Sequence, residues 1–202
     1  DPDPDVREHE NDLTQDERKL LGVYYLMRSR GKIVLFKNNL RAFFWCLSDI
    51  VFSQGASVTK QDMRAGLWLV IQKTYNHEKF HYHCDVFRNL FGSRRDALEE
   101  EALAVAWSRL MILRDRNDRR TTISNMDSKV FDLIIDHAFR YISPGYRDWS
   151  KYKDEGSFMK GLGCYINPPK YDFLQQQSNV MVDDLLMGMM GRMNPGFEEY
   201  IK

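Results

Sequence analysis

Cysteine and long hydrophobic runs are both scarce in this sequence. Its three cysteines, Cys46, Cys84 and Cys164, are odd in number and far apart, which indicates reduced, buried thiols rather than a set of disulfides. No apolar run approaches the roughly 18 residues that are needed to cross a bilayer. The sequence therefore predicts a protein without a membrane span.

A charge of one sign is also lacking. Lysine plus arginine and aspartate plus glutamate both number 29, so the formal net charge is zero. A balanced chain has no electrostatic footprint for nucleic acid or for an anionic membrane, and we predict no nucleic-acid partner. The sequence opens with Asp-Pro-Asp-Pro-Asp and carries no secretory hydrophobic region there. We therefore expect a cytoplasmic protein.

The 202 residues are enough for one sizeable hydrophobic core. Hydrophobic residues make up 43% of the chain and aromatic residues 13%, which argues for a well-filled core and against disorder. Residues 1–14 are acidic and contain proline. We predict a flexible arm over 1–14, followed by a single domain over 15–202.

Capping signals and apolar periodicity predict a mainly α fold, with a small sheet that makes it α+β. The capping box of Thr14 and Glu17 opens a helix to about residue 30, and the short apolar run Lys32–Phe36 is the best strand candidate. Turns are predicted at 37–39 and 114–120, and further helices over 40–53, 59–91, 96–110, 127–141, 148–161 and 182–193.

One of these helices contains the sequence His77-Glu78-Lys79-Phe80-His81. Residues four apart on a helix lie on the same face, about 6 Å apart along the axis. Two imidazoles at that spacing can bind one metal ion, and a glutamate between them can reach a water on that ion. The motif therefore predicts His77 and His81 as metal ligands and Glu78 as a base, with Lys79 extended outward to solvent.

A third ligand is expected from the next helix. A catalytic zinc takes three protein ligands and a water, and the acidic run 99–101 begins 18 residues after His81. Ala102, Ala104 and Ala106 follow this run and would let the two helices approach closely. We therefore expect one carboxylate of this run to complete the site.

Other polar residues of the predicted helices receive less specific roles. Asp85 is interpreted as a hydrogen-bonding partner behind the ligands or as a salt bridge along the helix, and Cys84 as a packed thiol. His83 lies about 200° around the helix from His81, so we expect a surface or hydrogen-bonded histidine there. Packing is the expected role of His137.

Together, these segments resemble a known family. The HExxH motif, followed on the next helix by glutamate and small residues, is similar to the gluzincin branch of zinc metallopeptidases. More narrowly, the chain resembles a group of small bacterial metallopeptidases, over residues 77–106 and more loosely over 144–165. The resemblance implies a zincin-like helical domain in which the HExxH helix packs against a glutamate-bearing helix.

The resemblance also implies the site residues. It makes His77, His81 and one glutamate the ligands of Zn²⁺, with Glu78 as the catalytic base. Glu100 is the preferred third ligand because it matches the pattern Glu-Glu-Ala-Leu-Ala, while Glu99 fits an alternative register.

The expected function is zinc-dependent hydrolysis of a peptide bond in a protein or peptide substrate. Glu78 would activate the attacking water, and Tyr141, Tyr146 or His137 would donate a hydrogen bond to the developing oxyanion. The alternative is a non-catalytic, metal-stabilised helical protein-interaction module. The methionine-rich segment Val182–Met193 favours that alternative, since methionine-rich faces suit adaptable binding surfaces.

Overall fold

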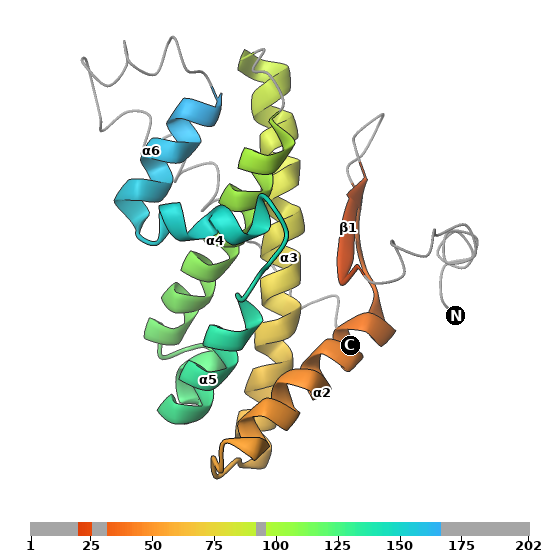
Figure 1. Ribbon diagram of the computed structural model, residues 1–202, viewed down its shortest axis with the longest axis vertical. Helices are drawn as coiled ribbons and strands as arrows, with labels where there is room; N and C mark the ends of the chain where they lie inside the picture. Colours follow the sequence, from red (N-terminus) through yellow and green to blue (C-terminus); the bar gives the residue numbers. More distant parts are fainter. Residues whose placement is uncertain (1–19, 26–31, 92–95, 167–202) are drawn as a thin grey trace.

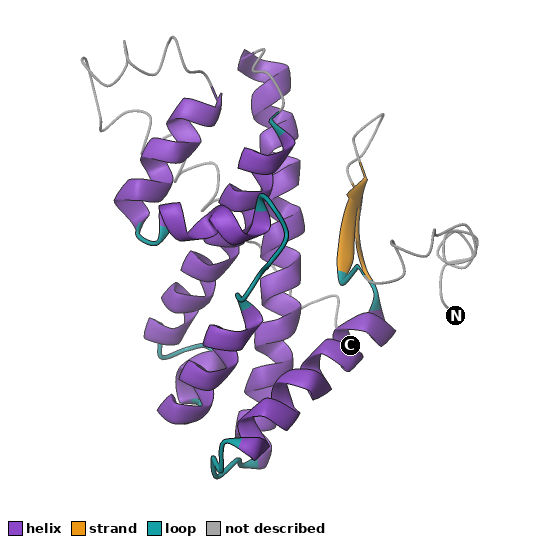
Figure 2. Cartoon of the chain, viewed as in Figure 1, coloured by secondary structure: helices purple, strands orange, loops and turns teal. Residues whose placement is uncertain are grey.

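The computed structural model describes residues 20–25, 32–91 and 96–166, and all structural statements refer to these residues. They form a mainly helical fold with a small two-stranded sheet, as the sequence predicts (Figure 2). The predicted arm over 1–14 and the predicted helix over 182–193 lie outside the described residues. The order of elements is β1 (Gly22–Tyr25), β2 (Lys32–Leu35), α2 (Lys37–Ser53), α3 (Lys60–Phe91), α4 (Ala97–Asn117), η2 (Ile123–Asn125), α5 (Ser128–Ala138), η3 (Tyr146–Tyr152) and α6 (Glu155–Ile166).

The long helix α3 is the centre of the arrangement (Figure 1). α4 runs back alongside it in the opposite direction, and this pair brings the HExxH segment next to the acidic run. α2 and the two strands lie on one side of α3 in this view, η3 and α6 pack on α4 on the other, and α5 packs against α2 and α3. The predicted pairing of the motif helix with a glutamate-bearing helix is therefore confirmed.

β1 lies where the sequence predicted a helix, and that prediction was wrong. β1 and β2 pair in antiparallel fashion, with Val23 opposite Val34 and Tyr25 opposite Lys32. The residues after Gly22 are β-branched or aromatic, which favours a strand. Gly22 itself lies against α3, where a Cβ would come within 2.9 Å of Thr74 Cγ2. Packing of the strand on α3 thus overrides the capping signal upstream.

Several predicted boundaries also move. The predicted turn at 37–39 is the first turn of α2, α5 ends at Ala138, and the predicted helix 148–161 is divided between η3 and α6. α4 continues to Asn117, into the predicted turn 114–120. Arg116 explains the longer helix, because its guanidinium donates to the carbonyl oxygens of Ile123 at 3.0 Å and Met126 at 2.6 Å.

α3 begins at a reciprocal capping box. The Thr59 N–H donates to Asp62 Oδ2 at 2.9 Å, and the Asp62 N–H donates to Thr59 Oγ1 at 3.1 Å. The other carboxylate oxygen of Asp62 accepts from the backbone N–H of Asp127 at 2.7 Å. Asp127 is in turn the N-cap of α5, so one buried carboxylate joins the starts of two helices.

Two apolar clusters hold the helices together. The first packs α2, the first half of α3 and α5, and includes Leu47, Leu69 and Ile134. The second packs the second half of α3, α4 and α6, and includes Phe80 and Leu162. The HExxH segment lies on α3 where the first cluster gives way to the second.

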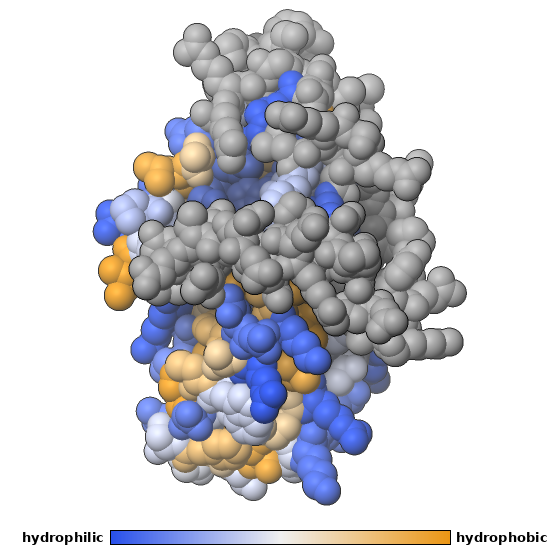
Figure 3. Space-filling view, turned by 90° about the vertical axis from the view of Figure 1, so that its right-hand side faces the viewer, coloured by the Kyte–Doolittle hydropathy of each residue, from blue (hydrophilic) through white to orange (hydrophobic). Residues whose placement is uncertain are grey.

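The side of the molecule that carries α2 and the strands has a mixed surface (Figure 3). Apolar areas on its lower half are separated by hydrophilic residues. Trp45 and Phe52 of α2 are 47% and 49% exposed. No helix among the described residues is both long enough and apolar enough to span a bilayer.

Candidate metal centre

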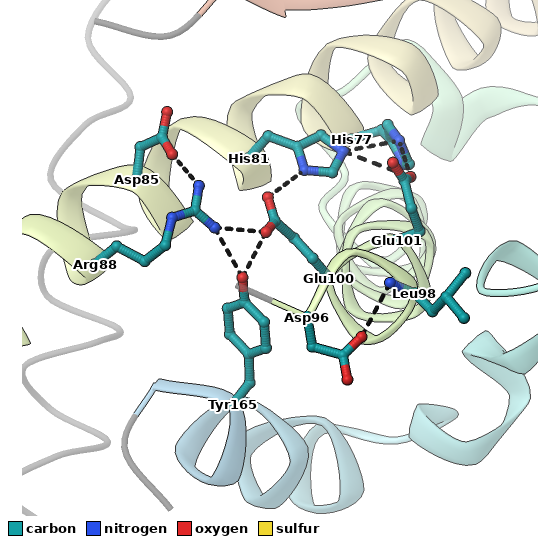
Figure 4. A network of polar contacts seen from close by, with 9 residues as sticks. All are labelled: His77, His81, Asp85, Arg88, Asp96, Leu98, Glu100, Glu101 and Tyr165. Atoms are coloured by element: carbon teal, nitrogen blue, oxygen red, sulfur yellow. Dashed lines mark hydrogen bonds and ion pairs between the residues drawn. The ribbon is translucent and has the colours of Figure 1, made fainter. Parts of the chain in front are cut away.

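The two histidines of the motif meet across one turn of α3. The imidazole centroids of His77 and His81 lie 4.9 Å apart, with the rings at 79° to each other. Their Nε2 atoms are 3.2 Å apart, so both nitrogens point to the same place beside the helix (Figure 4). This convergence is what the four-residue spacing predicts.

α4 brings a carboxylate to the same place. Glu101 Oε2 lies 3.1 Å from Nε2 of His77 and 3.6 Å from Nε2 of His81. The three donor atoms all lie within 4.8 Å of one another, and we call these residues the His77–His81–Glu101 triad. Two imidazole nitrogens and one carboxylate oxygen in this arrangement could hold a metal ion.

The donor atoms are spaced like the ligands of one ion. Ligands at about 2.0–2.1 Å from a tetrahedral ion lie about 3.3 Å from each other, close to the separations of 3.1, 3.2 and 3.6 Å in the triad. Glu101 Oε2 is buried, and it faces the Nε2 atoms of His77 and His81. Such an oxygen, lying between two imidazole nitrogens, fits a bound cation.

The charges around the triad also favour a cation. Burial acts to raise the pKa of Glu101, but the two imidazoles outweigh burial and hold that pKa well below its usual range. Burial acts to lower the pKa of His81, but Glu100 and Glu101 outweigh it and raise that pKa to about 10. The carboxylates thus stabilise positive charge at the imidazoles, and a metal ion would supply that charge.

A third ligand would have to face the two Nε2 atoms, and Glu100, the predicted third ligand, does not. Its Oε1 lies 2.8 Å from Nδ1 of His81, on the opposite edge of the ring. An ionised carboxylate only accepts hydrogen bonds, so Nδ1 carries a proton, and Nε2 is the nitrogen that would bind a metal ion. Glu100 therefore fixes the tautomer and orientation of His81.

Glu99, the other predicted candidate, points away from the triad and accepts a hydrogen bond from the Tyr152 hydroxyl of η3. The N-cap Asp96, which accepts from the N–H groups of Leu98 and Glu99, sets where α4 begins. Successive residues of a helix then point about 100° apart, and that rotation turns Glu101 towards the histidines. Sequence reasoning missed Glu101 because three adjacent glutamates give no sign of the helix rotation.

A buried network holds Glu100 in place (Figure 4). Arg88 Nη1 donates to Glu100 Oε2 at 2.6 Å and to the Tyr165 hydroxyl of α6 at 2.9 Å. Tyr165 donates to the same Glu100 oxygen, and Arg88 also pairs with Asp85. Burial acts to raise the pKa of Glu100, but hydrogen bonds from His81 and Tyr165, with the charge of Arg88, lower it to about 2.

This network has two members that the sequence did not reveal. Asp85 was expected behind the ligands or in a salt bridge along the helix, and its ion pair with Arg88 at i+3 is such a bridge. The spacing of those two residues could have identified Arg88. Tyr165 lies 65 residues after Glu100, and no sequence signal links the two.

Tyr146 lies beside the triad, and Glu78 follows His77 on α3. Glu78 is buried, at 8% exposed. The Tyr146 ring stacks on the His77 ring, with centroids 5.7 Å apart and planes 16° apart. Burial raises the pKa of the Tyr146 hydroxyl, and the charges of Glu101 and Glu78 raise it further, which keeps it protonated as a donor. The Tyr146 hydroxyl therefore lies beside the triad and within the electrostatic influence of Glu78.

The turn before Tyr146 packs tightly on α4. Gly145 has a φ of 79°, in the left-handed region that favours glycine. A Cβ at this position would lie 3.0 Å from the Leu98 carbonyl oxygen and 3.3 Å from Glu101 Cβ. The absence of a side chain thus lets the turn approach the residue that completes the triad.

The other predicted candidates lie elsewhere or in different surroundings. His137 Nδ1 lies 2.9 Å from the carbonyl oxygen of Leu133 in its own helix. Lys79 and His83 are 8% and 1% exposed, so the expected outward lysine is in fact buried. Burial, with the charge of Lys79, lowers the pKa of His83 to about 4.

The cysteines are only partly as predicted. All three are free. Cys84 is buried in the second apolar cluster, as expected of a packed thiol. Cys46 and Cys164 are exposed, so the prediction of buried thiols was wrong for them.

Comparisons of the chain with protein-family models, with curated proteins and with solved structures gave no match. The functional argument therefore depends on the site itself: a candidate metal centre made by two histidines of α3 and one glutamate of α4.

Proposed function

We propose that the protein is a zinc-dependent metallopeptidase that hydrolyses a peptide bond in a protein or peptide substrate. One observation carries the proposal: Glu101 Oε2 lies 3.1 and 3.6 Å from the two Nε2 atoms of an HExxH motif. Imidazole and carboxylate are ligands that zinc prefers, and catalytic zinc sites combine three protein ligands with an open position.

Zinc, when bound, supplies a Lewis acid that polarises the scissile carbonyl and brings the pKa of a water towards neutrality. The residues of this chain do the rest. The His77–His81–Glu101 triad holds the ion, and Glu100 keeps Nε2 of His81 directed at it.

Glu78 moves the proton. It accepts a proton from the attacking water as the water oxygen bonds to the carbonyl carbon. The carbon–nitrogen bond then breaks, and Glu78 returns the proton to the leaving amine nitrogen. The protonated Tyr146 hydroxyl, which lies close to Glu78 and Glu101, donates a hydrogen bond to the developing oxyanion.

The deciding experiment compares Glu78→Gln with the unaltered protein. Elemental analysis after purification without chelator measures bound zinc, and mass spectrometry of a random-sequence peptide pool measures cleavage. We expect about one zinc per chain in both proteins, and cleavage only with Glu78 present. A Glu78→Gln variant that cleaves as fast as the unaltered protein would contradict the assignment.

The competing function is a metal-stabilised interaction module without catalysis. Structural zinc sites are closed by four protein ligands, whereas the group found in the described residues has three. That difference favours catalysis. Stoichiometric zinc together with an intact peptide pool would favour the interaction module instead.

A further inference from the structure

A second charged group lies on α3, one turn before the triad. Lys73 precedes His77 by four residues, so the two side chains leave the same face of the helix, about 6 Å apart along its axis. Lys73 is only 5% exposed. Its backbone is held close to α4 by the Ser108 hydroxyl, which donates to the Lys73 carbonyl oxygen at 2.8 Å.

Three aromatic rings surround the Lys73 ammonium. Its Nζ lies 5.1 Å from the ring centroid of Phe43, 5.6 Å from that of Phe139 and 5.2 Å from that of Tyr141. These rings come from α2 and from the segment after α5, so separate parts of the fold converge on one cation. Phe43 and Tyr141 are half-buried, and the cage therefore reaches the surface on their side.

The cage stabilises the charge of Lys73 but gives its donors no acceptor. Ring faces attract a cation, yet an ammonium also carries three N–H donors. Within the described ranges, no carboxylate pairs with Lys73 and no oxygen accepts a hydrogen bond from it. The Nζ atom is not among the fully buried polar atoms of the described residues, so its donors are open to an acceptor from outside, and a bound carboxylate would supply a charge-assisted one.

An aromatic wall joins this cation to the metal centre. The Tyr141 ring that covers Lys73 lies 5.4 Å from the Tyr146 ring, and Tyr146 stacks on His77. An extended peptide advances about 3.3–3.6 Å per residue. The 6 Å step along α3 therefore corresponds to about two residues of a substrate.

We infer that Lys73 binds a carboxylate of the peptide substrate and so selects peptides that present one about two residues from the bond that is cut. This inference rests on the proposed peptidase function and adds a substrate class to it. The carboxylate could come from the C-terminus of a peptide or from an aspartate or glutamate side chain, and the experiment separates these two sources.

The first measurement is binding, which needs no cleavage. Zinc-loaded Glu78→Gln protein is immobilised and given equal amounts of random hexapeptides as free acids and as C-terminal amides, and retained peptides are counted by mass spectrometry. If the C-terminus is the source, free acids should be retained at least about tenfold better than amides, a difference typical of one charge-assisted hydrogen bond. Amides that are retained should be enriched in aspartate or glutamate if a side chain is the source.

Two substitutions at Lys73 test whether the charge of this residue causes the preference for carboxylates. Lys73→Met keeps an unbranched side chain in the aromatic cage but removes the charge, and should abolish the preference for carboxylates. Lys73→Arg keeps the charge and should retain part of the preference. Circular dichroism and one zinc per chain verify that both variants are folded.

The outcomes separate the inference from the proposed function. Equal retention of acids and amides with no enrichment of aspartate or glutamate among the retained peptides, or an unchanged preference in Lys73→Met, would overturn the role of Lys73. Cleavage at equal rates by the unaltered protein, whether or not the peptide carries a C-terminal or side-chain carboxylate, would do the same and leave the peptidase function intact. Selective retention of carboxylates without cleavage of any peptide would overturn the peptidase function alone.

Discussion

Three adjacent glutamates at the start of α4 have three different partners. Glu99 accepts from Tyr152, Glu100 from His81 and Tyr165, and Glu101 faces the two Nε2 atoms. The rotation of about 100° per residue along a helix separates them. The three identical side chains therefore differ in the direction in which they point, and this direction determines which partner each one contacts.

Substitution of each glutamate by glutamine should separate these roles. Glu101→Gln removes a charged ligand, and we expect zinc affinity to fall by more than about 100-fold. Glu100→Gln removes the carboxylate behind His81 and should cost about 10–100-fold. Glu99→Gln is the matched control and should leave affinity unchanged. Competition with a chromogenic chelator measures all three, and a Glu100→Gln effect larger than that of Glu101→Gln would reverse the two roles.

Tyr165 gives a second test at the residue scale. Tyr165→Phe removes one donor to Glu100 and one acceptor from Arg88. A buried polar group left without its partner costs about 1–3 kcal/mol, so the variant should unfold at lower urea concentration. Zinc affinity should fall less than in Glu100→Gln, because Glu100 still holds His81. Equal zinc affinity in Tyr165→Phe and the unaltered protein would show that Tyr165 of α6 does not contribute to zinc binding.

At the scale of elements, the turn before η3 positions the start of α4. Gly145→Ala should destabilise the fold twice over, through the positive φ and through the contact with Leu98. Gly55→Ala is the control, since Gly55 has a φ of 65° but a Cβ added to it would meet nothing within 4 Å. We expect Gly145→Ala to cost at least about 1 kcal/mol more than Gly55→Ala in urea unfolding, and only Gly145→Ala to weaken zinc binding.

The capping carboxylate that joins α3 to α5 predicts a pH dependence. Burial acts to raise the pKa of Asp62, but hydrogen bonds from Thr59 and from the backbone of Asp127 outweigh it, so the pKa lies below its ordinary value of 3.8. A lowered folded-state pKa means that the carboxylate stabilises the fold above pH 3.8 and that this contribution is lost as the pH falls through the folded-state pKa.

The corresponding variant is Asp62→Asn. At neutral pH it should lower the free energy of unfolding by about 0.5–2 kcal/mol, as loss of a helix cap does. Below about pH 4 the difference should shrink, and the two proteins should converge once the pH is below the folded-state pKa, because protonation removes the same charge from the unaltered protein. Chemical denaturation at about pH 7 and about pH 3 tests this, and a constant difference between the two proteins would exclude the carboxylate charge as the cause.

The elements differ in how well local sequence predicts them. The starts of α3 and α4 follow from Thr59, Asp62 and Asp96, whose side chains bond to nearby backbone groups. β1 could not be predicted in this way, because its conformation depends on Gly22 lying against Thr74, far along the chain. The motif histidines were predictable from spacing within one helix, whereas Glu101 and Tyr165 depend on how separate helices are rotated and packed.

At the scale of the whole molecule, the candidate metal centre lies between α3 and α4 and between two apolar clusters. An ion that binds only the folded state stabilises that state by mass action. At a free zinc concentration about 100 times the Kd, the free energy of unfolding should rise by about 2.7 kcal/mol. Thermal melts with and without zinc measure this gain, and Glu101→Gln should show almost none of it at the same concentration.

The length of α3 affects how the molecule unfolds. Its 32 residues extend about 48 Å, and each apolar cluster needs one half of this helix for its packing. Loss of either cluster therefore removes support from the turn that carries His77 and His81. Unfolding should consequently be all-or-none, with release of the ion coinciding with the loss of both clusters, so that zinc release reports the unfolding of the whole chain rather than a local opening.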